Sequence, residues 1–305
     1  METHQTPRTV ENIVREYATP LSVLAAGALV AMTVYYGPSG SSRSVSAGAN
    51  DSAELQEAVL PTAGVTLPIT WGDLGARLVE VGAIDPEKLA ALYEQRGGFP
   101  AEYQRLIEKN ANEKIVITNW NSGYLLNLLW ALGLANKNPI LEDPNEMMNP
   151  AYKGAGNFAS TGGWSIAQDS AMSHYNMHVL VSLTPAQQVL VDNVSRNIYR
   201  PCCGNSTHFP DCNHGMAMLG LLELMASQGV SEKDMYKTAL AVNSYWFPDT
   251  YLTIATYMKQ KGIAWKDVSP KEMLSAPYSS SSGYRDISSQ VTQPQQGQGG
   301  GGCSA

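Results

Sequence analysis

The residues best suited to chemistry are concentrated in residues 199–218, YRPCCGNSTHFPDCNHGMAM. This stretch holds three of the chain's four cysteines and two of its five histidines. Thiolate and imidazole are the usual ligands of zinc, and soft thiolates also select Cu(I). The pattern C-C-x8-C-x-H, formed by Cys202, Cys203, Cys212 and His214, therefore predicts a site for a zinc or copper ion.

The same thiols allow two other interpretations. A disulfide from Cys212 to Cys202 or Cys203 would staple the loop, and closing about ten residues is worth roughly 2–3 kcal/mol in the chain-entropy model. Cys212 also precedes a predicted helix, whose dipole would stabilise a thiolate. The alternative function is therefore a thiol–disulfide oxidoreductase that uses Cys212 with Cys202 or Cys203. No CxxC motif supports either reading, and the adjacent cysteines match no standard zinc pattern.

Four more side chains are further candidate ligands. His208 lies four residues before Cys212. His174 and His178 stand at i and i+4 in MSHYNMH and would share one face of a predicted helix, although such pairs are more often ordinary surface residues. Cys303 lies near the end of the chain and would reach the loop only on a flexible arm. The sequence assigns no catalytic residue and leaves open whether the protein is an enzyme.

Two predicted helices position the thiol loop. The first begins with Thr184 as its cap, Pro185 at its first position and Gln187 at its third, and it ends near Pro201. The second, GMAMLGLLELMASQG, leaves the loop and ends at Gly229. If the two helices pack antiparallel, both ends of the loop meet at one edge of the helical domain.

The rest of the chain is predicted to be helical almost throughout. Helices are expected over 70–82, after an Asp85 cap, over 164–180, and after a Ser231 cap. The leucine spacing in NWNSGYLLNLLWALGLANKN predicts a central, buried helix. Only KIVIT, at 114–118, is compatible with a short strand. The predicted fold class is all-α, a helical bundle domain over 65–277.

The N-terminal part predicts a membrane anchor. Residues 20–37 contain an uncharged apolar run at the short end of the roughly 17–25 residues that span a bilayer. With 1–19 as a short cytoplasmic segment, the positive-inside rule places the domain outside the membrane, beyond a flexible tether at 38–64. A cleaved signal peptide is the alternative. The Ser/Gln/Gly-rich segment 278–305 is predicted to be a disordered tail.

Composition excludes several function classes. The formal net charge is −7 and no basic stripe is present, which excludes a nucleic-acid partner. No phosphate loop, dinucleotide fingerprint or serine elbow occurs. The sequence therefore predicts a membrane-tethered, extracytoplasmic helical protein that binds a thiophilic metal ion, with the membrane as partner through 20–37 and no protein partner identified.

Overall fold

A buried pair of helices forms the centre of the molecule, α6 (Ser122–Ala135) and α9 (Asn213–Ser227). A computed structural model describes residues 42–108, 111–163 and 165–291 of the 305-residue chain. The chain divides into two units, Met1–Ser52 and Ala53–Ala305, and only the second is described at length. Every residue of α6 except Gly123 is buried, which confirms the central helix that the leucine spacing predicted.

The two central helices touch backbone to backbone. A Cβ atom added to Gly133 would lie 2.1 Å from the carbonyl oxygen of Met216, and one added to Gly220 would lie 2.4 Å from that of Leu129. Only glycine allows so close an approach, because any side chain would force the helices apart. This crossing fixes α9, and with it the residue that precedes it, against the core.

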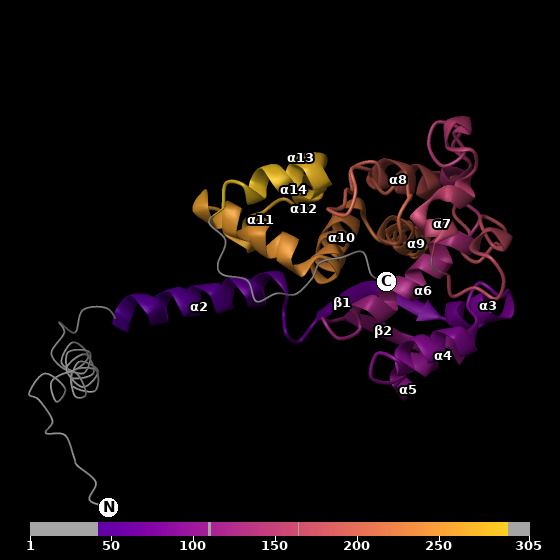
Figure 1. The fold of residues 1–305 in the computed structure, drawn as a ribbon, viewed down its shortest axis with the longest axis horizontal. Coiled ribbons are helices and arrows are strands. Elements are labelled where there is room, and N and C mark those ends of the chain that lie inside the picture. The colour runs from indigo at the N-terminus through magenta and orange to yellow at the C-terminus, as the bar shows by residue number, and fades with distance from the viewer. Residues whose placement is uncertain (1–41, 109–110, 164, 292–305) are drawn as a thin grey trace, which may run out of the picture. The chain divides into compact units, whose positions relative to one another are not determined.

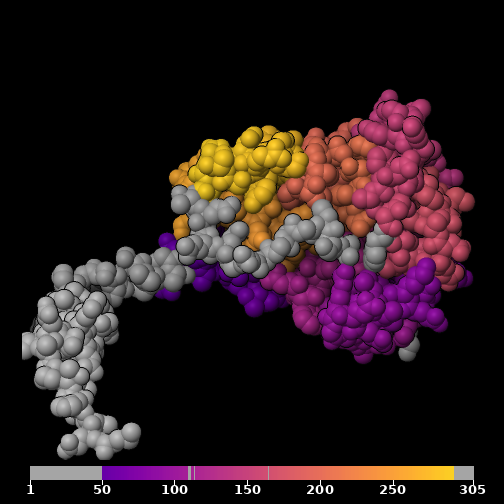
Figure 2. Space-filling model, in the orientation of Figure 1, coloured from indigo at the N-terminus to yellow at the C-terminus, as the bar shows by residue number. Residues whose placement is uncertain are grey.

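Shorter elements surround the central pair. In Figure 1, the strands and helices α3–α5 lie on one side of it and helices α10–α14 on the other. Figure 2 shows the same division on the surface, with indigo and violet N-terminal elements opposite the orange and yellow C-terminal helices. The α-helices are α2 (Ser42–Val59), α3 (Leu74–Glu80), α4 (Pro86–Glu94), α5 (Ala101–Glu108), α7 (Ala159–Gly162), α8 (Pro185–Ser195), α10 (Glu232–Trp246), α11 (Pro248–Gln260), α12 (Pro270–Met273), α13 (Ala276–Ser279) and α14 (Ser281–Ser288). Short 3-10 helices are η1 (Pro139–Glu142), η2 (Pro150–Tyr152), η3 (Ala155–Asn157), η4 (Ala171–Ser173) and η5 (Trp265–Asp267).

One small antiparallel sheet accompanies the helices. It pairs β1 (Val65–Gly72) with β2 (Ala111–Ile117), and β2 includes most of the predicted KIVIT strand. The helix predicted from residue 70 was wrong at its start, because Thr70 lies inside β1 and α3 follows Asp73. Alternate residues of β1 are buried. The alternation of buried and exposed side chains therefore determined a strand here, although the capping pattern predicted a helix start. Gln228 completes the edge of β1: its amide accepts from Thr70 N at 2.8 Å and donates to Thr70 O at 2.7 Å.

Local capping signals were more reliable. Asp85 accepts from two backbone N–H groups at the start of α4, as predicted. Thr184 and Gln187 form the predicted capping box of α8. Ser231 accepts from the backbone N–H of Asp234 at the start of α10. Such caps depend on neighbouring residues alone, which is why the sequence reveals them.

A carboxyl group lies buried between segments of the core. Glu223 of α9 has no exposed surface, and it accepts hydrogen bonds from Asn136 Nδ2 at 3.1 Å and Asn138 Nδ2 at 2.6 Å. Burial raises the pKa of Glu223 from its ordinary 4.5 to about 8. The group is therefore largely protonated at neutral pH.

The localisation prediction requires correction. The anchor predicted at 20–37 lies outside the described residues, and within those residues no helix is long and apolar enough to cross a membrane. The most apolar described helices are α6, with 14 residues, and α9, with 15. Both are shorter than the roughly 17–25 residues required, and their apolar side chains pack in the core. The structure thus gives no support to a membrane-anchored, extracytoplasmic domain.

Both predicted flexible segments contain helices. The predicted tether, 38–64, includes α2, and Val59 and Leu60 at its end are buried. The predicted tail, 278–305, includes α14, where Ile287 is buried and Ser280 caps the helix. Pairing with α11 supplies the apolar burial that the composition of this segment did not indicate. Residues 292–305, including Cys303, lie outside the described residues.

The helix predicted over 164–180 is also wrong. In the described part of this range, the structure has η4 and irregular backbone, and Asn176 adopts a positive φ of 59°. Asn176 N and His178 N instead donate to the last carbonyls of α6, those of Leu134 and Ala135. The backbone of this segment hydrogen-bonds the free carbonyls at the end of α6 and does not form the helix that its local pattern predicted.

Candidate metal centre

The loop between α8 and α9 folds back on itself. The backbone N–H of Thr207 donates to the carbonyl of Ile198 at 2.8 Å, and the Thr207 hydroxyl donates to the same oxygen at 3.0 Å. Cys202 lies in the turn that these bonds close, and Cys212 is the N-cap residue of α9. The predicted helix–loop–helix junction is present.

The C-terminal helices support this loop from outside. The backbone N–H of Tyr199 donates to the carbonyl of Leu274 at 2.8 Å, and that of Ser281 donates to the carbonyl of Cys203 at 2.9 Å. The segment predicted to be a disordered tail therefore begins with a helix that holds the loop of Cys203 in place.

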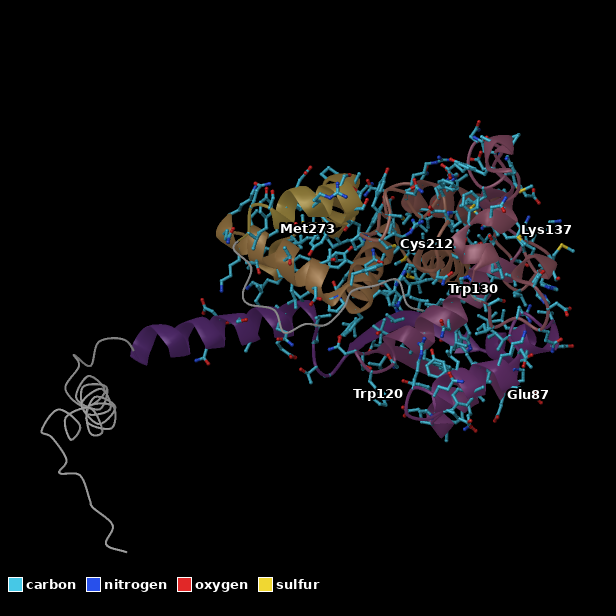
Figure 3. All side chains as sticks on the ribbon, in the orientation of Figure 1. Glu87, Trp120, Trp130, Lys137, Cys212 and Met273 are labelled. Carbon is cyan, nitrogen blue, oxygen red and sulfur yellow. The ribbon has the colours of Figure 1, made fainter. Side chains whose placement is uncertain are left out.

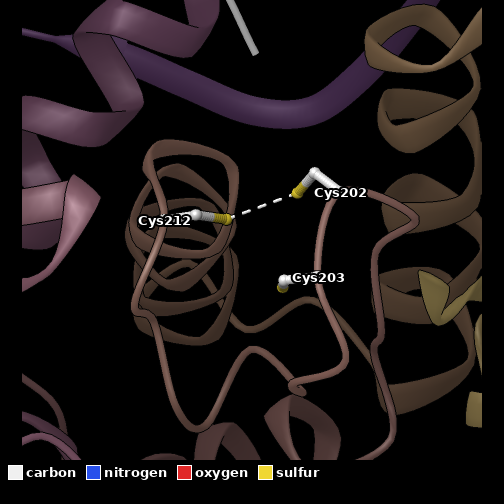
Figure 4. A group of neighbouring side chains, drawn as sticks. All are labelled: Cys202, Cys203 and Cys212. Carbon is white, nitrogen blue, oxygen red and sulfur yellow. Dashed lines mark hydrogen bonds between the residues drawn. The ribbon is translucent and has the colours of Figure 1, made fainter. Parts of the chain in front are cut away.

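Three sulfur atoms converge at the start of α9. Cys202 Sγ lies 3.5 Å from Cys212 Sγ, and the Sγ atoms of Cys202, Cys203 and Cys212 all lie within 4.8 Å of one another. Figure 4 shows Cys202 and Cys212 pointing toward each other across this gap. All three are free thiols with partly exposed side chains. We call these three residues the thiol cluster.

A buried arginine lies against the thiol cluster. Arg200 is only 1% exposed, and its Nε donates to Cys212 Sγ at 2.9 Å. Its Nη2 donates to Asp211 Oδ1 at 2.5 Å and to the carbonyl of Phe209 at 2.9 Å, while Nη1 donates to that of Asn205 at 3.1 Å. The guanidinium thus joins the carboxylate, the loop backbone and one sulfur atom in a single network.

Two neighbouring residues fit this arginine into place. The Asn205 side chain donates to Asp211 Oδ2 at 2.8 Å, so both carboxylate oxygens are engaged. Gly215, in the first turn of α9, leaves room for the guanidinium, since a Cβ there would lie 2.5 Å from Arg200 Cζ. In Figure 3, Cys212 marks the position of this network within the fold.

The thiol pKa values are strongly divided. Hydrogen bonds from Cys202 and Cys203, and then the positive charge of Arg200, hold the pKa of Cys212 well below its usual range. The pKa of Cys202 is raised, chiefly because its hydrogen bonds favour the protonated thiol. The pKa of Cys203 is raised to about 11. Cys212 is therefore the thiol of the cluster that loses its proton most readily.

His214, the fourth predicted ligand, lies near the cluster but outside the compact sulfur group. Its hydrogen bond to Cys212 is among the causes of the low pKa of that thiol. Its ring packs against Phe247, with centroids 4.4 Å apart, and against Trp246 at 5.7 Å. The close-set sulfur group consists of Cys202, Cys203 and Cys212, and His214 is not among its members.

His208, a further candidate ligand, belongs to a different group. Its Nδ1 lies 2.6 Å from Glu146 Oε2 and its Nε2 lies 2.7 Å from Asp192 Oδ1. Asp143 completes a set with Glu146 and His208 whose ligand atoms lie within 4.8 Å of one another. Burial opposes the charged imidazole, but Glu146 and Asp192 outweigh burial and raise the pKa of His208. The sequence placed His208 with the cysteines only because of its spacing from Cys212.

The other candidate ligands do not join the thiol cluster in the described structure. The rings of His174 and His178 do meet, with Nδ1 and Nε2 3.3 Å apart, although the predicted α-helix that would have paired them is absent. Burial lowers the pKa of His174. Cys303 lies outside the described residues, so its proposed contact with the loop stays a prediction.

Sequence reasoning missed the charged residues around both groups. Arg200 lies two residues before Cys202, and a cation so near three cysteines was the available signal. No local signal pointed to Asp143 or Glu146, because they are more than 60 residues from His208 in the chain.

Comparisons with models of protein families, with curated proteins and with solved structures find no match in any of the three. Arguments about function therefore depend on the geometry of the two side-chain groups.

Proposed function

We propose that the thiol cluster binds one thiophilic metal ion through Cys202, Cys203 and Cys212. The observation that carries this proposal is the convergence of three sulfur atoms within 4.8 Å of one another. Zn–S bonds of about 2.3 Å in a tetrahedral site place sulfur atoms about 3.8 Å apart. The 3.5 Å between Cys202 Sγ and Cys212 Sγ is close to that separation, so an ion requires only small side-chain movements.

The donor set favours Cu(I) over zinc. Soft thiolates select Cu(I), which accepts three sulfur ligands, whereas structural zinc requires a fourth ligand. His214 is the proposed fourth ligand for zinc because it already hydrogen-bonds Cys212. Its packing against Phe247 would have to loosen to bring a ring nitrogen into the sulfur group.

The surroundings reduce the proton cost of loading the ion. Thiols must lose protons to become ligands, and the lowered pKa of Cys212 makes its proton the easiest of the three to remove. Arg200 contributes a positive charge that offsets part of the negative charge of the three thiolates that would hold the ion. The partial exposure of the cysteines leaves a route for the ion to enter and leave.

Removal of one ligand tests the proposal. Reduced protein titrated anaerobically with Cu(I) against a coloured chelator is expected to bind one ion per chain. Cys212→Ser is expected to weaken binding more than about 100-fold, because loss of a ligand should exceed the 10–100-fold effect of losing an outer-shell partner. Glu94→Gln, at an exposed position of α4, is the control and should retain the ion.

The metal proposal fails if the wild-type chain binds no Cu(I) or zinc, or if Cys212→Ser binds as tightly as the wild type. A parallel zinc titration of His214→Ala separates the two metals. Loss of zinc with Cu(I) retained would assign His214 as the fourth zinc ligand.

A second candidate function is thiol–disulfide exchange, favoured by the 3.5 Å contact between a low-pKa and a high-pKa thiol. The Cys212 thiolate would attack a disulfide of a partner and release one partner thiolate. Cys202, after giving up its proton, would then attack Cys212 Sγ in the mixed disulfide and release the second. The two cysteines are thereby oxidised and the partner disulfide is reduced.

A thiol count in glutathione buffers of graded potential tests this chemistry. We expect two thiols per chain to disappear together as the buffer becomes more oxidising, and Cys202→Ser to abolish that step. Cys203→Ser is the control that should retain it. A count that stays constant across the buffers would exclude the exchange function and leave the metal proposal untouched.

A further inference from the structure

A second group of ligand-type side chains lies outside the thiol cluster. His208 is 1% exposed and lies between Glu146, in the connection after η1, and Asp192 of α8. Asp143 adds a second carboxylate oxygen beside that of Glu146. We call Asp143, Glu146 and His208 the histidine–carboxylate group.

Asp192 determines which nitrogen of His208 is available. Its Oδ1 lies 2.7 Å from Nε2, so Nε2 must carry a hydrogen, because otherwise two lone pairs would face each other. Arg196 Nη2 also lies 2.8 Å from Nε2, but two N–H groups cannot hydrogen-bond each other. Nη2 therefore donates to Asp192 Oδ1, at 3.1 Å. A carboxylate that fixes one imidazole N–H is the usual support of a histidine whose other nitrogen binds a metal.

The opposite nitrogen, Nδ1, lies 2.6 Å from Glu146 Oε2, so by the same argument it carries a hydrogen when no ion is bound, and a cation would replace that hydrogen. One ligand atom from each of Asp143, Glu146 and His208 lies within 4.8 Å of the others. A histidine–glutamate hydrogen bond accounts for two of these groups, and Asp143 Oδ1 accepts from the backbone N–H of Asn145 at 2.8 Å. The second carboxylate oxygen of Asp143 is the one that an ion shared with Glu146 and His208 would bind.

The charge balance favours a cation here. Three carboxylates surround His208, those of Asp143, Glu146 and Asp192, and Arg196 binds only Asp192 among them, through Nε at 3.0 Å and Nη2 at 3.1 Å. An arginine already held by Asp192 at 3.0 Å cannot neutralise the other two. When His208 is neutral, the histidine–carboxylate group therefore has an excess of negative charge.

A cavity adjoins the group. It has a volume of about 450 Å³, and Asp143, Asp192 and His208 line it together with apolar side chains that include Ile140 and Val189. Three protein ligands leave coordination positions unfilled, and an ion with open positions toward a cavity can bind water or a small ligand.

We infer that Asp143, Glu146 and His208 form a second cation site, for a divalent ion of the Mn²⁺ or Zn²⁺ class. Its mixed nitrogen and oxygen donors suit such ions, whereas the thiol cluster suits soft ions. The two sites are independent, because they share no ligand.

Titration of the full-length, reduced protein with Mn²⁺, followed by electron paramagnetic resonance of the free ion, tests the inference. Mn²⁺ is chosen because thiolates are poor ligands for it. The wild-type chain is expected to bind one Mn²⁺. Asp143→Asn and Glu146→Gln should each weaken binding at least about tenfold, and Cys212→Ser should leave it unchanged.

Glu142→Gln provides the matched control, because Glu142 lines the same cavity and the exchange removes the same charge. It should change the affinity less than threefold. The inference is overturned if folded wild-type protein binds no Mn²⁺ at about 1 mM, the weak end of protein cation sites. It is equally overturned if Glu142→Gln weakens binding as much as Glu146→Gln, since attraction would then be diffuse. The ligand variants are at partly exposed residues, and circular dichroism of each variant is the check that it remains folded.

Discussion

Replacing Arg200 with methionine is expected to lower the free energy of unfolding by about 3 kcal/mol and to raise the pKa of Cys212. Arg200 is fully buried and holds Asp211, two loop carbonyls and Cys212 Sγ. Its loss leaves a carboxylate without its cation and buried acceptors without donors. We place the loss at the low end of the range for broken buried pairs because Asp211 is 20% exposed and water can partly replace the arginine.

Arg200→Met is expected to change the pKa of Cys212 in a defined direction. The pKa of Cys212 is held low first by hydrogen bonds from Cys202 and Cys203 and then by the charge of Arg200. The variant keeps the first cause and loses the second, so the pKa rises toward its ordinary value without reaching it. In the folded wild type the thiolate stabilises the protein above the ordinary thiol pKa, and this stabilisation is lost as the pH falls through the lowered pKa.

Two measurements check this prediction. Denaturant unfolding under reducing conditions gives the stability, and the pH dependence of Cys212 alkylation gives the pKa. Arg285→Met, on the exposed surface of α14, is the matched control and should change neither. An unchanged alkylation profile in Arg200→Met would show that the guanidinium does not stabilise the thiolate.

Replacing Glu223 with glutamine is expected to change the pH dependence of stability by up to about 5 kcal/mol. Burial raises the pKa of Glu223 from 4.5 to about 8, and each pKa unit is worth about 1.4 kcal/mol. Between these values the folded protein holds a proton that the unfolded chain releases. Wild-type stability from this group is therefore complete below pH 4.5 and is lost as the pH rises to about 8. Glutamine does not titrate, so the stability of the variant relative to the wild type increases as the pH rises from 4.5 to about 8.

The comparison of wild type with Glu223→Gln depends on how stability changes with pH, not on the stability at one pH. Glutamine presents one acceptor oxygen where the carboxyl presents two, so Asn136 or Asn138 loses a partner and the variant starts less stable at pH 4.5. Unfolding measured from pH 4.5 to 8 should show the difference shifting steadily toward the variant. Glu94→Gln, at an exposed position of α4, is the control and should run parallel to the wild type. A parallel course for Glu223→Gln would mean that Glu223 is ionised in the fold.

The sequence predicted that the three thiols of Figure 4 would lie close together, but it did not reveal the charged residue that tunes them. Cys202, Cys203 and Cys212 are close in the chain, and the junction between two helices is a local feature that caps and proline reveal. The low pKa of Cys212 was expected from its place at a helix start. The larger causes are the neighbouring thiols and then Arg200, whose burial no local pattern encodes.

By itself, the sequence determined the features that depend on neighbouring residues: the buried α6, the capped starts of α4, α8 and α10, and the gathering of three thiols in one loop. These follow because caps and apolar periodicity act within a few residues. Only the tertiary structure decided which groups meet across longer separations. It brought Glu146 to His208, placed α14 against the loop of Cys203, and buried Arg200 beneath Gly215. Such contacts arise from packing the whole core, in which the burial of apolar surface and the pairing of buried charges override local preference.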